Sequence, residues 1–180
     1  MLSKLKSKKV IISTLFISLV IPSVFALAAS TLVATTVPNT LQAKSYWCWN
    51  GSSVAVLANK GKTVTQAAFS TTVKGNSTNN STATSTEVKT GLSKYGYSST
   101  LTTSLSTGTV RTELSNSRPI IAGYLYKSGG GHMVVISGHD SSTNYLQVMD
   151  PGSGSKVNYL SSYFTSNSTW TWAESLYNIK

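Results

Sequence analysis

The sequence of 180 residues contains only one cysteine, five acidic residues and four prolines. One cysteine cannot form a disulfide within the chain, so the fold cannot depend on the cross-links common in small exported domains. Fifteen basic residues are present, but beyond the N-terminal segment they stand singly. This excludes the basic stripe typical of nucleic-acid-binding proteins, and we expect no nucleic-acid partner.

Long apolar runs are also missing, because the longest one is too short to span a bilayer comfortably, which takes about 20 residues. It covers residues 10–21, follows a segment with four lysines and no acid, and precedes the small residues Ala26, Ala28 and Ala29. This order is typical of a secretory signal peptide. We predict that residues 1–28 are removed and that the mature protein is secreted, without stable membrane insertion; an uncleaved anchor is the alternative.

The remainder of the chain has the size of one ordinary domain. Residues 29–40 are interpreted as a linker or short pro-segment, and residues 41–180 as the domain. Removing the four leader lysines leaves eleven basic and five acidic residues, a net charge of +6. Such a charge favours mild attraction to an anionic cell surface. We expect the mature protein to be a monomer.

Helical patterns occupy the first half of the domain and strand patterns the second half. Helices are predicted at residues 48–59, about 64–73, 86–96 and 110–117. The low-complexity segment 76–86 is predicted to be a mobile loop. Runs of β-branched and aromatic residues predict strands at 119–126, 132–138, 145–150, 156–160 and near 169–177. Helices followed by an antiparallel sheet indicate an α+β fold.

The cysteine, Cys48, lies between Trp47 and Trp49 and at the start of a predicted helix. The positive end of the helix dipole stabilises a thiolate there, and the thiolate is the nucleophilic form of cysteine. A buried, unreactive cysteine is the alternative, since cysteine is among the most buried residue types. A catalytic thiol also needs a base, and the chain offers His132 and His139.

The predicted strand hairpin distinguishes these two histidines. With a symmetric turn near Ser141, His132 falls opposite Asp150, whereas His139 lies close to the turn. At about 3.3 Å per residue, the histidines are about 23 Å apart along the strand and cannot share a site. Asp150 can accept a hydrogen bond from one ring nitrogen of His132 and leave the other for the thiol. His139 is predicted to be solvated, and Asn144 is a second candidate for the orienting role.

Gln42 stands six residues before Cys48 and supplies a side-chain amide. Attack of a thiolate on a carbonyl needs hydrogen-bond donors for the developing oxyanion. The Gln42 amide and the backbone N–H of Cys48 could provide them if the intervening loop folds back over the thiol. Glycines 129–131 precede His132, where missing side chains would allow a substrate backbone to approach closely.

Several of these features together resemble the papain-like cysteine peptidases. They are Gln42, W-C-W at 47–49, G-H-M-V-V-I-S-G at 131–138 and V-M-D-P at 148–151. The compact bacterial branches are the most similar: bacteriocin-leader-processing peptidases and their secreted relatives, staphopains and the cysteine-protease effectors of plant pathogens. The resemblance runs from about Val37 to about Tyr163.

The resemblance implies a papain-like fold with N-terminal helices packed on a C-terminal antiparallel sheet. It also implies that Gln42 belongs to the oxyanion hole, Cys48 is the nucleophile, His132 the base and then the acid, and Asp150 the orienting residue. Two features depart from the pattern. Cys48 and His132 are 84 residues apart, fewer than the roughly 130 to 150 of papain and the cathepsins. Asn50 stands where the compact branches usually have a small residue.

These observations predict a secreted cysteine peptidase that hydrolyses peptide bonds of a peptide or protein substrate through a thioester. No metal or other cofactor is expected, because a lone cysteine with two distant histidines is a poor zinc ligand set. Two alternatives stay open. One is a peptidoglycan amidase or endopeptidase with the same Cys–His chemistry. The other is a non-catalytic binding module on the same fold.

Overall fold

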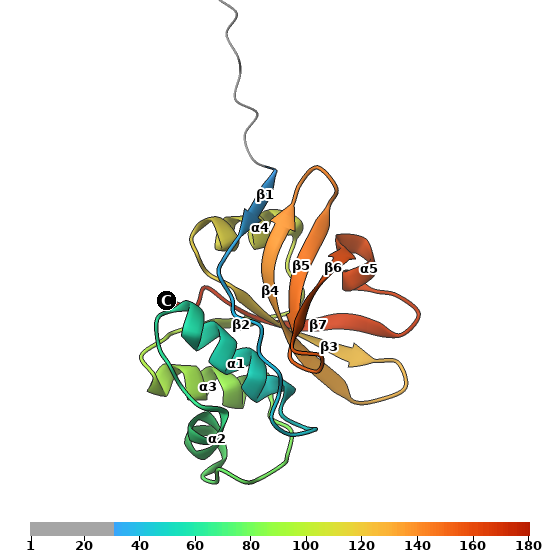
Figure 1. Cartoon of the computed structure of the whole chain (residues 1–180). Coiled ribbons are helices and arrows are strands. Elements are labelled where there is room, and N and C mark those ends of the chain that lie inside the picture. Colours follow the sequence, from blue (N-terminus) through green and yellow to red (C-terminus); the bar gives the residue numbers. More distant parts are fainter. Residues whose placement is uncertain (1–30) are drawn as a thin grey trace, which may run out of the picture.

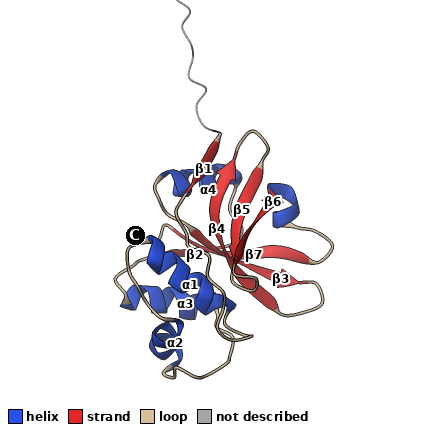
Figure 2. Ribbon diagram, in the orientation of Figure 1, coloured by secondary structure: helices blue, strands red, loops and turns tan. Residues whose placement is uncertain are grey.

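The computed structural model describes residues 31–180, and the predicted signal peptide therefore lies outside the described residues. These residues form an α+β fold in which helices pack against a seven-stranded antiparallel sheet (Figures 1 and 2). The helices are α1 (Cys48–Asn59), α2 (Gln66–Lys74), α3 (Ser85–Lys94), α4 (Thr107–Ser115) and α5 (Ser161–Thr165). The strands are β1 (Leu32–Ala34), β2 (Thr100–Thr102), β3 (Ile120–Tyr126), β4 (Gly131–Asp140), β5 (Tyr145–Asp150), β6 (Ser155–Leu160) and β7 (Trp170–Tyr177).

The sheet has the strand order β2-β7-β3-β4-β5-β6, and β1 pairs with the end of β4. The predicted α+β class is confirmed, and the four predicted helices precede the five predicted strands, but β1 and β2 lie among the first elements and α5 lies between β6 and β7. The short elements β1, β2 and α5 were not predicted, because three to five residues are too few for a periodic pattern. The interpretation of residues 29–40 as a linker is wrong for β1, which joins the sheet, and for Val37, which is buried.

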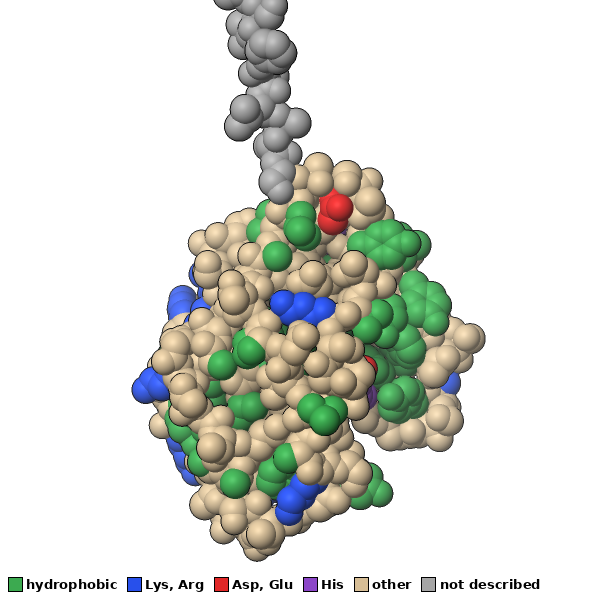
Figure 3. Space-filling view, viewed as in Figure 1, with side chains coloured by type: hydrophobic (Ala, Val, Ile, Leu, Met, Phe, Trp, Pro, Cys, Tyr) green, Lys and Arg blue, Asp and Glu red, His purple; other side chains and the backbone are tan. Residues whose placement is uncertain are grey.

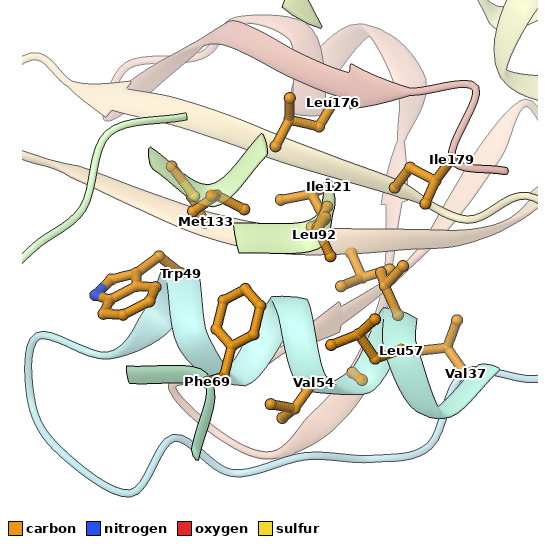
Figure 4. Packing of buried hydrophobic residues seen from close by; sticks show 14 of the residues in the cluster. Val37, Trp49, Val54, Leu57, Phe69, Leu92, Ile121, Met133, Leu176 and Ile179 are labelled. Carbon is orange, nitrogen blue, oxygen red and sulfur yellow. The ribbon is translucent and has the colours of Figure 1, made fainter. Parts of the chain in front are cut away.

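Helix α1 is the central element of the helical layer. Nine consecutive residues, 49–57, are buried, because the helix lies between the sheet on one side and α2 and α3 on the other. Figure 4 shows its side chains Trp49, Val54 and Leu57 pointing among residues from other elements, including Phe69 of α2 and Met133 of β4. The first turn of α1 is thereby fixed against the middle of the sheet.

The polar segment between α2 and α3 is held in place, contrary to the prediction of a mobile loop. Trp47 Nε1 donates a hydrogen bond to the carbonyl oxygen of Asn79 (2.7 Å), and Trp49 Nε1 donates to that of Ser81 (3.0 Å). Both tryptophan side chains are almost completely buried. The two tryptophans beside Cys48 therefore pack the helix and anchor the loop next to it.

Within residues 31–180, no helix combines the length and the hydropathy that a membrane span requires.

Candidate active site

Cys48 is the first residue of α1 and is partly buried. Trp47 occupies the N-cap position, and no side chain caps the helix. The N–H groups of the first turn are therefore directed toward the region of the thiol, as the helix dipole argument requires. The backbone N–H groups of Met133 and Trp49 form hydrogen bonds with the sulfur.

His132 lies on β4 between Cys48 and Asp150. Its Nε2 atom is 2.6 Å from Asp150 Oδ1, and its side chain is also hydrogen bonded to Cys48. With Nε2 facing the carboxylate, Nδ1 is the ring nitrogen left for the thiol. Asp150 Oδ1 additionally accepts the backbone N–H of Gly152 (2.8 Å), which fixes the carboxylate. The structure thus brings three of the four predicted site residues into one hydrogen-bonded chain.

The predicted pairing register of the hairpin was three residues off beside the turn, where Asp140 pairs with Tyr145, and two residues off toward His132. Val135 pairs with Met149, and a bulge follows between Ile136 and Gly138. Continuing this register places His132 opposite Gly152, just beyond the end of β5. Asp150 reaches the imidazole because the chain turns at the end of β5, so the predicted proximity holds although the predicted facing positions do not.

Electrostatics favour a thiolate–imidazolium pair. Burial raises the pKa of the Cys48 thiol, but hydrogen bonds from His132 and from the backbone, together with the His132 charge, lower it below its ordinary value. Burial lowers the pKa of His132, yet its bonds to Asp150 and Cys48 outweigh this and raise the pKa to about 9. Hydrogen bonding by His132 also lowers the pKa of Asp150 against the effect of burial. At neutral pH the proton therefore belongs on the imidazole.

Gln42 lies beside the first turn of α1, but its amide is already engaged. Nε2 donates hydrogen bonds to the carbonyl oxygens of Lys44 and Ser45, both at 2.8 Å. Oε1 is buried and has no hydrogen-bond partner among residues 31–180. To contact an oxyanion, the Gln42 amide would therefore have to break its hydrogen bond to the carbonyl oxygen of Lys44 or Ser45 and donate to the oxyanion instead.

Helix α2 holds the segment that carries Gln42. Gln66 Oε1 accepts the backbone N–H of Ala43 (2.8 Å), and Gln66 Nε2 donates to the carbonyl oxygen of Leu41 (2.8 Å). Asn50, which departs from the small residue usual in the compact branches, is fully buried and donates from Nδ2 to the carbonyl oxygen of Gln66 (2.8 Å). Asn50 thus links α1 to the residue that clamps both sides of Gln42.

Gly51 sets the distance between α1 and the two loops that carry Gln42 and Asp150. A Cβ atom at Gly51 would lie 2.8 Å from Pro151 Cβ and 3.5 Å from the Cα and Cβ atoms of Gln42. The proline ring cannot rotate away, so any side chain must separate the loops from the helix. Absence of a side chain is therefore a steric requirement of this site.

Gly51→Ala is expected to lower kcat/KM by about tenfold or more, because displacements near 1 Å can cost about 10²-fold in rate. The matched control is Gly108→Ala in α4, where the added Cβ would meet only Ser106 Oγ at 3.7 Å. The measurement is kcat/KM for peptide hydrolysis by each variant, expressed per folded molecule. Equal activity of the two variants would contradict this role of Gly51.

A cavity of about 400 Å³ opens beside the thiol. It lies between the start of α1, the segment before α3 and the strands β3, β4 and β7, and Cys48 and His132 are among its lining residues. Gly130 and Gly131 also line it, but glycine is first required by the turn itself, where Gly129 and Gly130 have φ angles of +96° and +81°. Figure 3 shows a hollow in which acidic and histidine atoms surface beside a group of hydrophobic side chains.

Residues 34–176 match the model of the Peptidase_C39-like family. The chain belongs to the C39-like peptidase family. It is therefore a cysteine peptidase with a papain-like fold, as the sequence predicted. None of the curated proteins compared with this C39-like peptidase matches its sequence.

Two solved structures show the same fold at low sequence identity. The peptidase domain of Streptococcus ComA, a bi-functional ABC transporter involved in a quorum-sensing pathway, is 19% identical with a TM-score of 0.60. That similarity covers 77% of this chain and 95% of the domain. A double-glycine-motif protease from an AMS/PCAT transporter, solved in complex with the leader peptide, is 18% identical with a TM-score of 0.61, covering 82% of this chain and 94% of the protease.

Two other predicted features of the C39-like peptidase are corrected by the structure. His139 was expected to be solvated but is only 4% exposed, because β4 is buried at this position, and its Nε2 lies 3.2 Å from Asn144 Oδ1. Asn144 therefore contacts His139 and not His132.

No group of three metal-ligating side chains occurs within residues 31–180.

Sequence reasoning missed the aromatic support of His132. The ring of Tyr124 lies 5.5 Å from the imidazole, centroid to centroid, and stacks at 4.9 Å on Trp170. Tyr124 faces His132 directly in the β3–β4 register, which the sequence shows only once the turn between these strands is known. Tyr124 thus packs against the imidazole, and Trp170 in turn packs against Tyr124.

Proposed function

We propose that the chain is a secreted C39-like peptidase that cleaves peptide bonds through a thioester formed on Cys48. The hydrogen-bonded chain from Cys48 through His132 to Asp150 carries this proposal. Secretion rests on the predicted signal peptide in residues 1–28. A peptide substrate is supported by the structural relative that was solved with a leader peptide.

In the first half of the reaction, the Cys48 thiolate attacks the carbonyl carbon of the scissile bond. The Cys48 N–H and a rearranged Gln42 amide donate hydrogen bonds to the oxyanion. The C–N bond then breaks, and the protonated His132 gives its proton to the leaving amine. Asp150 holds the imidazole with Nε2 toward the carboxylate throughout.

In the second half, water enters the position left by the amine. The neutral His132 accepts one proton from this water, and the resulting hydroxide attacks the thioester carbonyl. The C–S bond breaks and the carboxylic acid product leaves. Cys48 returns to the thiolate form and His132 to the protonated form, so that all protons balance over the cycle.

The direct test measures the alkylation rate of Cys48 by iodoacetamide as a function of pH. A free thiol titrates near 8.5, whereas a histidine-paired catalytic thiol titrates several units lower. We expect the alkylation rate of the wild type to be independent of pH from the alkaline range down to well below pH 7. In His132→Ala, the rate should instead fall as the pH drops below the ordinary range of a thiol. Slow alkylation with an ordinary thiol titration, unchanged by the substitution, would contradict the proposed chemistry.

A further inference from the structure

Glu174 of β7 stands out because it is an exposed residue that lines the cavity beside Cys48 and has no cationic partner among residues 31–180. Among residues 31–180 it forms no ion pair, and Oε2 accepts a hydrogen bond from Ser85 Oγ (2.5 Å). Of the other four acidic residues, three pair with a basic residue or a histidine, and Asp140 accepts hydrogen bonds from Ser142 outside the cavity lining. The three pairs are Glu87 with Lys74, Glu113 with Arg118 and Asp150 with His132.

Capping of α3 does not account for Glu174. The start of that helix already has a complete capping box, in which Thr84 Oγ1 accepts the backbone N–H of Glu87 and the Glu87 carboxylate accepts the backbone N–H of Thr84. A carboxylate placed against α3 in addition is not required to satisfy the helix end. The capping of α3 therefore does not explain why Glu174 lines the cavity.

The sheet register connects Glu174 to the nucleophile. Glu174 pairs with Gly123 of β3, and Gly123 pairs with Met133 of β4, whose backbone is hydrogen bonded to Cys48. Directly paired residues share one face of a sheet, so this row leads from the carboxylate to the thiol. Two strand spacings separate its ends, roughly 10 Å.

Gly123 leaves the middle of this row open. A Cβ atom there would already lie 3.7 Å from Glu174 Cβ and 3.9 Å from Met133 Cγ, so any larger side chain would fill the space between them. Trp49, Ala83 and Ala173 add apolar surface to the same cavity. A long apolar stem that ends in a positive charge fits such a channel, because lysine and arginine bury their methylene groups and keep the charge at a polar rim.

We propose that Glu174 selects a lysine or arginine side chain that lies one or two residues from the scissile bond of the substrate. The inference rests on the proposed function and adds a substrate class to it. The carboxylate forms a charge-assisted hydrogen bond with the cationic group, and Ser85 holds the carboxylate in the orientation that faces the channel.

The test uses acyloxymethyl ketone probes that alkylate Cys48 irreversibly and need no natural substrate. Each probe carries glycine at the reactive position and lysine, norleucine or glutamate at one of the next two positions. We expect lysine to accelerate inactivation over norleucine by about five- to tenfold. Glu174→Gln should reduce the ratio of the lysine rate to the norleucine rate to about one, and added salt should reduce the same ratio in the wild type.

Asp140→Asn is the matched control, since it removes one carboxylate outside the cavity lining and leaves an oxygen that can still accept the hydrogen bonds of Ser142. It should retain the wild-type preference. Lysine probes that inactivate the wild type no faster than norleucine probes, or an equal preference in Glu174→Gln, would overturn the selection of a basic side chain. Iodoacetamide alkylation of the same samples reports separately on the Cys48–His132 pair, so a failure of the proposed function is recognised independently.

Discussion

His132→Ala is expected to lower kcat/KM for peptide hydrolysis by about 10²–10⁴-fold, the range that general acid–base catalysis contributes. The hydrogen bond and charge of His132 lower the pKa of Cys48, so the variant has less thiolate at neutral pH. It also lacks the proton donor for the leaving amine. Initial rates on a mixture of quenched-fluorescent peptides, recorded from acidic to alkaline pH, measure both losses.

The pH profile of the wild type provides a second readout of the same pair. The pKa of His132 is raised to about 9, despite burial, by its bonds to Asp150 and Cys48. Its proton is present below that pH and lost above it. Hydrolysis should therefore decline as the pH rises through about 9, while alkylation of the thiolate continues, because alkylation needs no proton donor.

His139→Gln is the matched control for His132→Ala. His139 lies on the same strand and is buried, but it contacts Asn144 and not the thiol. Its kcat/KM per folded molecule should equal that of the wild type. Comparable losses in the two variants would mean that instability of β4, and not loss of the imidazole at the site, explains the result.

Phe69→Ala is expected to lower the free energy of unfolding by about 3–5 kcal/mol, the usual cost of removing a large aromatic side chain from a core. Phe69 is fully buried and contacts Trp49 and Tyr95, with ring centroids 5.9 and 5.8 Å away. The cavity would open beside the first turn of α1. Urea denaturation followed by tryptophan fluorescence measures the change.

Val157→Ala on β6 serves as the comparison, since Val157 is 37% exposed and loses little buried surface. It should change the free energy of unfolding by less than about 1 kcal/mol. A Phe69→Ala variant no less stable than Val157→Ala would show that the helical layer can collapse around the missing ring. In that case α1 would not owe its position to α2.

The residues that lie close in sequence are the ones that the sequence itself placed correctly. The start of α1 at Cys48 was predicted to the residue, because a helix end depends on neighbouring residues. The proximity of His132 and Asp150 followed from one hairpin, in which 18 residues separate the partners. Even there, the turn lies further along the chain than predicted, since Asp140 pairs with Tyr145, and the bulge between Ile136 and Gly138 changes the register again by one residue.

Only the tertiary structure determined what surrounds this local framework. Glu174 meets Ser85 across 89 residues of sequence, and β7 pairs with β3 although β4, β5 and β6 separate the two strands in the chain. The engagement of Gln42 by loop carbonyls and the burial of His139 likewise depend on distant segments. Local sequence determined the helix that begins at Cys48, the hairpin and the chemistry of the site. The side of the cavity that carries Glu174 required the pairing of strands far apart in the chain.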